Sequence, residues 1–514
     1  MMESIQSRPT YAAVLDRRVW IMLLLGFSAG LPLLLIFGTL SLWLREAGVE
    51  RSVVTMFSWA ALGYSFKFVW APLVDQLPLP LATRMLGKRR SWLLLSQGMI
   101  ILALWLMSIV DPGTGGWSLQ YMAFAAVLLG FSSATQDIVI DAFRIESAEP
   151  RMQALLSSTY IAGYRIAMLV AGAGALLLAE WLGSLPDAYD HSAWSSTYRI
   201  MSVCMLVGVV TTLLVREPDH PAQQERSTRE NLQLLLLFFC AVLAFILSYL
   251  AGAGPAAVMK STLKELLQNG ALAGLVVETA RLGTGLLLAW LVARLLSGFA
   301  LVPASIARGA YLAPLQEFFQ RHGWGVAWLV LALIGLYRIA DIVLGVIANV
   351  FYYDLGFSKS EVAVVAKTFG LGMTIVGGFA GGLLAFRYGV MRILLLGAIL
   401  AAGTNLLFMV LAGTGKNIGM LYAVIGADNL SAGLASTAFV AFLSALTNIR
   451  FTAVQYAIFS SLMTLLPKVV GGYSGTMVDT MGYSSFFLMT AVMGIPVVIL
   501  ILVAMRVLTL KVPR

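Results

Sequence analysis

Long apolar stretches recur from one end of this 514-residue sequence to the other, and they restrict its fold more than any other feature. A helix that crosses a hydrocarbon core of about 30 Å needs about 20 predominantly apolar residues. Hydrophobic residues make up 60% of the chain and charged residues 11%, whereas about 25% of the residues of soluble domains are charged. The sequence therefore predicts an all-α membrane protein that crosses the bilayer many times.

The apolar stretches fall into three groups. Six spans precede a charged, proline-containing stretch at 216–230, two follow it, and six more follow an amphipathic segment at 305–323. The predicted domains are a first six-helix bundle (1–219), an inserted section (220–323) and a second six-helix bundle (324–514). The predicted spans lie at 19–43, 52–74, 92–110, 119–144, 153–181, 197–215, 231–250, 273–297, 324–351, 361–386, 392–412, 418–447, 452–477 and 483–506.

The distribution of Lys and Arg predicts the orientation of the chain. With the N-terminus inside, 21 of the 34 basic residues lie on cytoplasmic segments, 7 lie outside and 6 lie within spans. Because cytoplasmic loops of membrane proteins are rich in Lys and Arg, both termini are predicted to be cytoplasmic. The same bias accounts for the pI near 9.5, and no nucleic-acid partner is expected.

A weak internal repeat links the two halves. The stretch 44–54 resembles 353–363, and 129–135 resembles 432–438 at an equivalent place in the second half. Two like-oriented six-helix halves joined by a cytoplasmic link resemble the major facilitator superfamily. That resemblance implies a substrate site between the halves near the middle of the membrane.

Ionisable residues occur inside several predicted spans. Each costs roughly 2.5–3.5 kcal/mol on insertion scales, so such residues usually face a partner or a wet cavity. Cations near the middle of the membrane predict an anionic substrate group, and desolvated acids predict proton binding. The predicted substrate-binding cations are Lys67, Arg165, Arg338 and Lys468, and the predicted proton-coupling acids are Asp137, Asp141, Asp341 and Asp428.

Helical phase groups some of these charges. Asp137, Asp141 and Arg144 share one narrow face of their helix. Two i,i+3 ion pairs are possible, Asp141 with Arg144 and Arg338 with Asp341. Alternatively, these pairs have a purely structural role and only hold helices together. Asp137 has no cation at i+3 or i+4, so it is predicted to be the more desolvated acid. Asp141 and Arg144 are predicted to form a structural or gating pair.

No sequence motif indicates catalysis. The stretch "GTGKN" at 413–417 lacks the first glycine and the Ser/Thr of a phosphate-binding loop. No nucleophile–base pair or metal-ligand spacing is recognisable, so we expect neither an enzyme nor a bound cofactor or metal. Transport is then predicted to draw its energy from an ion gradient.

The stretch "DQLPLPLATRMLGKRRSW" at 75–92 is the second basic feature. Anchoring at the cytoplasmic surface is one explanation for it. It also resembles the cytoplasmic loop signature of the major facilitator superfamily, with a long insertion between the acid and the glycine. That resemblance implies a gating network that favours the inside-closed state. The matching residues are Asp75, Gly87, Lys88, Arg89 and Arg90.

A more specific resemblance covers both halves in order. Stretches such as "SSATQDIVIDAFRIE" and "KTFGLGMTIVGG" are similar to the muropeptide permeases of the AmpG type. This implies a multi-pass protein of the bacterial inner membrane. It would import N-acetylglucosaminyl-anhydro-N-acetylmuramyl peptides into the cytoplasm with protons, for cell-wall recycling and, in some bacteria, β-lactamase induction. The matching stretches lie at 24–49, 64–75, 89–97, 132–146, 163–183, 314–324, 367–378 and 436–448.

Polar side chains in the spans suit such a substrate. The cations of the protein would bind its peptide carboxylates, and neutral side chains would bind its sugar hydroxyls and amides. The chain departs from some members of the family by carrying its two extra spans between the halves. Two alternative functions remain: transport of another anionic metabolite, and a role in pigment or light-harvesting assembly. We expect the protein to be a monomer in the lipid bilayer. The predicted neutral contacts are Tyr64, Gln136, Asn349, Asn429 and Gln455.

Overall fold

A computed structural model of the chain describes most of its residues. Among them it contains 13 helices that are long and apolar enough to cross a membrane. The second predicted span, 52–74, falls partly outside the described residues. The remaining predicted spans each correspond to one of these helices, so the expectation of an all-α membrane protein is confirmed. The described residues are 15–50, 53–54, 57, 63–149, 152–184, 188–218, 227–267, 270–299, 301–471 and 474–509.

The chain divides into two compact units. Unit 1 comprises Met1–Val74, Pro78–Pro221 and Trp324–Arg514, and unit 2 comprises Asp75–Leu77 and Ala222–Gly323. The predicted boundaries at 219/220 and 323/324 stay a prediction.

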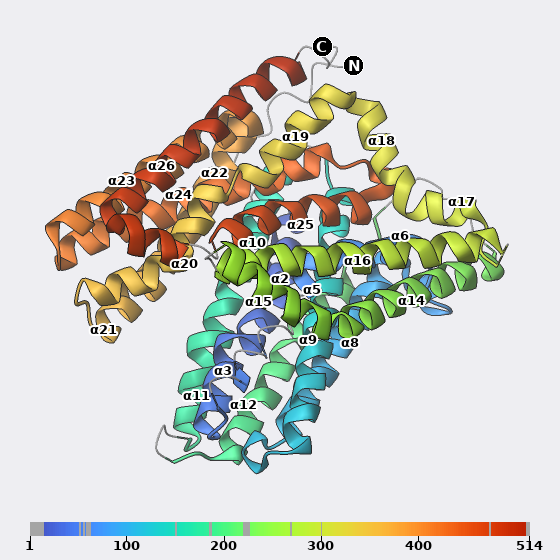
Figure 1. Cartoon of the computed structure of the whole chain (residues 1–514), viewed down its shortest axis with the longest axis horizontal. Coiled ribbons are helices and arrows are strands. Elements are labelled where there is room, and N and C mark those ends of the chain that lie inside the picture. Colours follow the sequence, from blue (N-terminus) through green and yellow to red (C-terminus); the bar gives the residue numbers. More distant parts are fainter. Residues whose placement is uncertain are drawn as a thin grey trace. The chain divides into compact units, whose positions relative to one another are not determined.

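The first bundle of unit 1 is drawn in blue to pale green in Figure 1. Its helices are α2 (Arg17–Ile36), α3 (Gly38–Glu46), α5 (Gly63–Phe66), η2 (Lys67–Val69), α6 (Ala71–Gln76, whose last two residues fall in unit 2), α7 (Ala82–Leu86), α8 (Lys88–Ile109), η3 (Pro112–Thr114), α9 (Trp117–Glu146), α10 (Gln153–Leu169), η5 (Val170–Gly174), α11 (Ala175–Trp181), α12 (His191–Cys204) and α13 (Leu206–Leu214).

The second bundle of unit 1 is drawn in yellow to red in Figure 1. Its helices are α19 (Trp324–Leu336), α20 (Ile339–Asp354), α21 (Lys359–Val362), η7 (Ala363–Phe369), α22 (Gly370–Tyr388), α23 (Val390–Thr414), α24 (Ile418–Leu446), η8 (Ile449–Phe451), α25 (Thr452–Gly471) and α26 (Ser474–Thr509).

Several spans are interrupted, which hydropathy did not predict. Proline lacks a backbone N–H and disturbs the turn around it, and Pro32 precedes the break between α2 and α3 at Phe37. Lys67 begins the short 3₁₀ segment η2, and Arg338 lies in the turn between α19 and α20. Non-helical backbone at membrane depth is tolerated only where protein or a water-filled cavity surrounds it. Two of the predicted substrate-binding cations therefore lie at backbone irregularities.

Glycines bring neighbouring helices into direct backbone contact. A Cβ at Gly163 of α10 would collide with the Leu23 carbonyl of α2, and one at Gly433 of α24 would collide with the Thr374 carbonyl of α22. Membrane helices commonly associate through such small residues, because the short side chain lets the backbones pack closely. These two contacts fix helix pairs that carry predicted site residues.

Interhelical bonds mark the two ends of the first bundle. At one end, called the Arg144 end below, Arg17 donates to the Leu214 carbonyl at 3.0 Å and Arg18 donates to the Ser147 carbonyl at 3.2 Å. At the other, called the Asp111 end, the Tyr189 hydroxyl donates to the Asp111 carboxylate at 2.7 Å. Helix starts and ends alternate between these two ends, as expected for a polytopic bundle.

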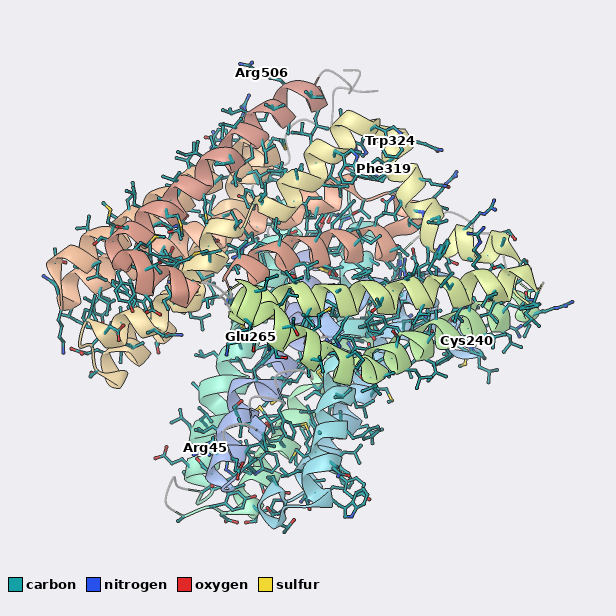
Figure 2. All side chains as sticks on the ribbon, in the orientation of Figure 1. Arg45, Cys240, Glu265, Phe319, Trp324 and Arg506 are labelled. Carbon is teal, nitrogen blue, oxygen red and sulfur yellow. The ribbon has the colours of Figure 1, made fainter. Side chains whose placement is uncertain are left out.

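Unit 2 is built on a long helical hairpin of α14 and α16. Few residues of its two spans are buried (11% and 12%), and side chains project outward along both helices in Figure 2. These values suit helices that face lipid. A helix between them, α15, was not predicted. The helices are α14 (Thr228–Ala251), α15 (Ala253–Leu267), α16 (Gly270–Gly298), α17 (Ala304–Ala307), η6 (Arg308–Leu312) and α18 (Ala313–His322).

Candidate functional site

The ionisable residues of α9 are buried inside unit 1. The exposed fraction is 8% for Asp137, 6% for Asp141 and 0% for Arg144. They share one face because α9 continues unbroken from Trp117 to Glu146, so residues three to four apart point the same way. The face predicted from helical phase is therefore present, and it points into the protein rather than into lipid.

Asp141 binds two cations at once. Its Oδ1 accepts from the Arg144 guanidinium at 3.1 Å, which is the predicted i,i+3 pair. Its Oδ2 lies 3.6 Å from the Lys67 ammonium of η2. The Lys67 contact was not predicted, because these residues are far apart in the sequence. Lys67 is 7% exposed and is engaged by an acid of the protein in this conformation, whereas the sequence had assigned it to a substrate carboxylate.

Arg144 also connects the two bundles. Its guanidinium donates to the Ser157 hydroxyl of α10 at 2.9 Å and to the Ser444 hydroxyl of α24 at 2.7 Å. It also lies 5.3 Å from the centre of the Tyr456 ring of α25, within cation–π range. One buried cation of the first bundle thus holds two helices of the second, which fits the predicted gating role.

Asp137 is the buried acid with unsatisfied hydrogen-bonding capacity. Its Oδ1 has no hydrogen-bond partner among the described residues. Lys67 and Asp141 are the charged groups that act on it, and neither is bonded to it. An ionised carboxylate in this situation costs several kcal/mol, and uptake of a proton removes most of that cost. The arrangement suits a group that exchanges a proton.

Two predicted neutral contacts lie beside this cluster. Gln136 is fully buried and accepts from the Ser28 hydroxyl at 3.0 Å, while its Nε2 has no partner among the described residues. The hydroxyls of Tyr64 and Ser133 share a hydrogen bond at 2.5 Å. The two N–H donors of Gln136 are therefore unused among the described residues, whereas Tyr64 is held by α9.

A second set of charges lies where the bundles face each other. The Arg165 guanidinium of α10 donates to the Met168 sulfur at 3.8 Å, and it has no carboxylate partner among the described residues. It experiences repulsion from Arg338 of the second bundle. Arg338 pairs with Asp341 at 3.3 Å, the second predicted i,i+3 pair, with exposed fractions of 25% and 14%. Arg165 is thus a cation at the interface between the bundles that has no counter-ion in the described part of the chain.

The remaining predicted site residues lie in different environments. Asp428 accepts a hydrogen bond from the Thr404 hydroxyl at 3.3 Å, and the like charge of Asp341 repels it. Asn429 is satisfied by Thr374 and by its own helix backbone. Gln455 caps the Asn448 backbone N–H at 2.7 Å, and Asn349 is exposed. The side chain of Lys468 is not among the side chains that the structure describes.

The predicted gating loop forms bonds within the first bundle. Gly87 has a φ of +90°, and a Cβ there would collide with the Glu217 side chain, so the position requires glycine. Glu217 accepts from the backbone N–H groups of Arg89 and Arg90 at 2.6 and 3.0 Å. The Arg89 guanidinium pairs with Glu146 of α9 at 2.7 Å.

The remaining residues of the loop motif differ in position. The Arg90 guanidinium donates to the carbonyls of Thr212 and Leu213 at the end of α13. Lys88 begins α8 and is half-buried. Asp75 is buried and belongs to unit 2, so the motif is divided between the two units.

Four residues that the sequence reasoning missed are central to this geometry. Glu146 and Glu217 bind the basic loop, and Ser444 and Tyr456 receive Arg144. The two glutamates had a usable signal in the sequence, since each is an acid at the end of a predicted helix, on the side predicted to be cytoplasmic. Ser444 and Tyr456 had none, because a serine or tyrosine in an apolar span is common.

No metal centre is evident in the described part of the chain, which contains no group of three or more His, Cys, Asp or Glu residues placed to hold an ion. The polar groups are instead arranged as paired and unpaired charges between helices. This arrangement can bind an anion, exchange a proton or hold two bundles together.

Comparison with solved structures defines the class of protein. The chain is similar to FucP, a major facilitator superfamily transporter in the outward conformation, with a TM-score of 0.59 and 14% identity over 95% of this chain and 98% of that one. It is also similar to the proton:xylose symporter XylE, with a TM-score of 0.55 and 11% identity over 95% and 94%. The fold is that of a major facilitator superfamily transporter.

Sequence relatives define the family more narrowly. The anhydromuropeptide permease of Escherichia coli K12 is 31% identical over 490 residues, covering 95% of this chain and 80% of the relative. The putative transporter AmpG 4 of Rickettsia felis is 30% identical over 487 residues, covering 95% and 96%. The family described as acetyl-coenzyme A transporter 1 matches residues 18–181. The chain belongs to the AmpG-type permease family, and it is a multi-pass membrane transporter rather than an enzyme.

Proposed function

We propose that this protein imports anhydromuropeptides from the periplasm into the cytoplasm by symport with protons. The observation that carries the proposal is the pairing pattern of the charges inside unit 1. One cation at the interface between the bundles, Arg165, has no carboxylate partner among the described residues, and one buried acid, Asp137, has an unpartnered oxygen. The first suits an anionic substrate group and the second suits a proton.

The substrate class rests on the family and on this cation. A relative with 31% identity over nearly the whole chain is named anhydromuropeptide permease. Its substrate carries peptide carboxylates, and a guanidinium binds a carboxylate through two parallel, charge-assisted hydrogen bonds. Arg165 is proposed to bind such a carboxylate, with Arg338 adding positive potential from the second bundle.

The proton site is proposed to be Asp137. When Asp137 is ionised, it adds a negative charge beside the Lys67–Asp141–Arg144 cluster. When it is protonated, that charge is removed. The proton can therefore change the balance of the cluster that holds the bundles together through Ser444.

The predicted orientation of the chain supports the proposed direction of transport. The positive-inside bias assigns the Arg144 end to the cytoplasm, with both chain termini on that side. The contact between the bundles through Arg144 then closes the cytoplasmic side. Import proceeds if substrate and proton bind from the periplasm and this contact opens.

Uptake of another anionic metabolite is the second candidate. The acetyl-coenzyme A transporter 1 family matches residues 18–181, which contain Lys67, Asp137, Asp141 and Arg165. Acetyl-coenzyme A is also anionic, so the same cations could bind it. The near full-length match to the permeases favours the muropeptide.

The test is uptake of labelled anhydromuropeptide by vesicles with an imposed pH gradient. Accumulation should stop when the pH gradient and membrane potential are dissipated, and it should persist when ATP is depleted with the gradient clamped. Excess unlabelled acetyl-coenzyme A should not compete. Accumulation that follows ATP would rule out symport, and competition by acetyl-coenzyme A would favour the second candidate.

A further inference from the structure

The lipid-facing helix α16 of unit 2 carries two arginines in different surroundings. Arg281 pairs with Glu278 at 3.0 Å, donates to the Tyr249 carbonyl at 2.7 Å and stacks on the Tyr249 ring at 3.9 Å. Arg294 makes one contact among the described residues, with the Trp290 ring at 5.3 Å. Arg281 has a carboxylate partner inside the hairpin, whereas Arg294 is exposed and has no carboxylate partner among the described residues.

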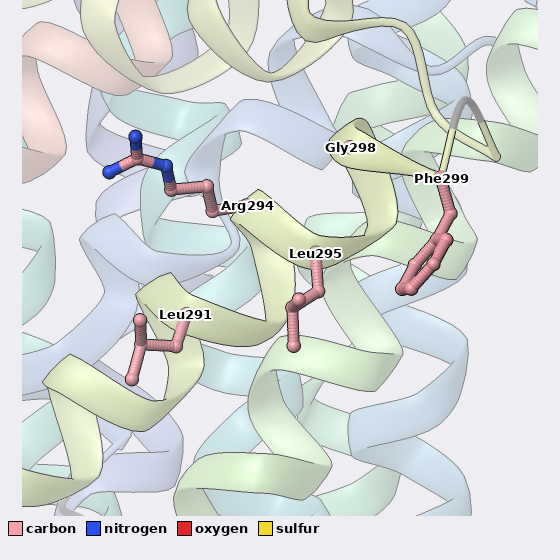
Figure 3. Close-up of a pocket in the computed structure, with 5 residues that line it drawn as sticks. All are labelled: Leu291, Arg294, Leu295, Gly298 and Phe299. Carbon is pink, nitrogen blue, oxygen red and sulfur yellow. The ribbon is translucent and has the colours of Figure 1, made fainter.

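Arg294 borders an open groove on α16. The groove has a volume of about 310 Å³, within the range of small-molecule sites, and Figure 3 shows the five residues that line it. At about 100° per residue, Arg294 and Phe299 lie roughly 140° apart and form its two edges. Leu291, Leu295 and Gly298 form the floor between them.

The apolar part of the groove is accessible. Phe299 is 75% exposed and Leu295 is 56% exposed, and Gly298 adds no side chain. The site therefore combines one cationic edge with an apolar strip that continues along the helix.

Arg294 lies near one end of the candidate membrane span Val276–Gly298, a position that suits the boundary between hydrocarbon and headgroups. It lies four residues before the end of the helix, or about 6 Å. Gln233 of α14 donates to the Leu301 carbonyl at 3.0 Å, which places this end of α16 beside the start of α14. Arginine and tryptophan are favoured at this depth, because their apolar parts lie in hydrocarbon and their polar ends reach the headgroups.

We propose that this groove binds an anionic glycerophospholipid of the surrounding bilayer. The Arg294 guanidinium would bind oxygens of the phosphodiester, as it binds other planar or tetrahedral oxyanions. An acyl chain would lie along Leu291 and Leu295 with Phe299 at its edge. This site is independent of the proposed transport function, since none of its residues belongs to unit 1.

The chemistry favours a lipid over a free phosphate ester. A free phosphate ester would use the cation and leave the apolar floor uncovered. A membrane lipid uses both, and its headgroup supplies a counter-ion that Arg294 does not find among the described residues, at the depth where the bilayer presents it.

The experiment measures phosphatidylglycerol retained by the purified full-length protein, using native mass spectrometry after exchange into mixed phosphatidylcholine and phosphatidylglycerol. Arg294→Gln should reduce the apparent affinity for phosphatidylglycerol about tenfold, because it removes a charge-assisted hydrogen bond to the phosphodiester, worth roughly 1.5 kcal/mol. Phosphatidylcholine retention should change little, because that lipid has no net charge.

The matched control is Arg387→Gln. Arg387 stacks on Tyr388 at 5.4 Å near the end of α22, a similar arginine–aromatic pair outside the groove. It should leave phosphatidylglycerol retention unchanged. Equal retention by wild type and Arg294→Gln would overturn the proposal. So would equal losses from both arginine variants, or competition by glycerol 3-phosphate as effective as that by phosphatidylglycerol.

Discussion

The buried cluster of the first bundle and the charges at the interface between the bundles use similar residues differently. In the cluster, Asp141 serves both Lys67 and Arg144, and all three are less than 10% exposed. At the interface, Arg338 is a quarter exposed beside Asp341, and Arg165 has no acid among the described residues. Charges paired within the protein stabilise a conformation, and a charge left without a counter-ion is available to a ligand.

The cost of burial gives this difference an energy scale. Removing one partner of a buried ion pair costs roughly 3–5 kcal/mol, because the other charge stays behind uncompensated. An exposed pair contributes about 0–1 kcal/mol. If the comparison is right, substitutions in the cluster should act mainly on stability, and substitutions at the interface should act mainly on binding.

Arg144→Gln should have the largest effect on stability. It removes the bonds to Asp141, Ser157 and Ser444. The free energy of unfolding should fall by about 3 kcal/mol, which is at the low end for a buried ion pair because Lys67 still compensates Asp141. The thermal unfolding midpoint of the purified protein measures it.

A double-mutant cycle separates the contact between the bundles from the rest. Arg144→Gln combined with Ser444→Ala should lose less than the sum of the single losses, because the residues share one bond. A thermal midpoint for Arg144→Gln equal to that of wild type would remove the structural role of the cluster.

Arg165→Gln should weaken substrate binding and leave stability unchanged. A charge-assisted hydrogen bond is worth roughly 1.5–3 kcal/mol, or about ten- to a hundredfold in affinity. The measurement is the Kd for an anhydromuropeptide with free carboxylates and for its amidated analogue. A loss confined to the free-carboxylate ligand is expected, and equal losses for both would assign Arg165 to helix packing.

Gly382→Ala should disturb the contact between the bundles without changing any charge. A Cβ at this position of α22 would lie 2.6 Å from the Ser158 hydroxyl and 3.2 Å from the Ala154 carbonyl of α10. Overpacking of this kind costs about 1–3 kcal/mol. The unfolding midpoint should fall, and the second substitution Ser158→Gly should restore it. Failure of that rescue would show that these helices do not pack closely here.

Arg338→Gln should have the smallest effect. Its pair with Asp341 is partly exposed, so stability should change by less than about 1 kcal/mol. Substrate affinity should fall less than in Arg165→Gln, because Arg338 already has an acid beside it. A larger loss of affinity than in Arg165→Gln would reverse the roles of the two arginines.

The sequence predicted the parts of the molecule that depend on local patterns. Hydropathy located the long helices, because a membrane span requires a continuous apolar stretch. Helical phase predicted the pairs Asp141–Arg144 and Arg338–Asp341, because i,i+3 neighbours meet on any helix. Breaks at Phe37 and near Arg338 were missed, since hydropathy does not register backbone irregularity.

Contacts between segments far apart in the chain could not be predicted from the sequence. Lys67 meets Asp141, and Arg144 meets Ser444 and Tyr456, only once the helices have packed. The sequence therefore identified Lys67 as a charge in need of a partner and could not identify the partner. The functional roles of the site residues stay predictions.

The most direct test of the division between coupling and structural charges is Asp137→Asn. The neutral amide mimics a permanently protonated acid, so the variant should fold and bind substrate. Proton-driven uptake should be compared with substrate counterflow, which needs no proton gradient, in the same vesicles. The account predicts counterflow near the wild-type rate and no proton-driven accumulation. Normal proton-driven accumulation by Asp137→Asn would contradict it and would transfer the coupling role to Asp341 or Asp428.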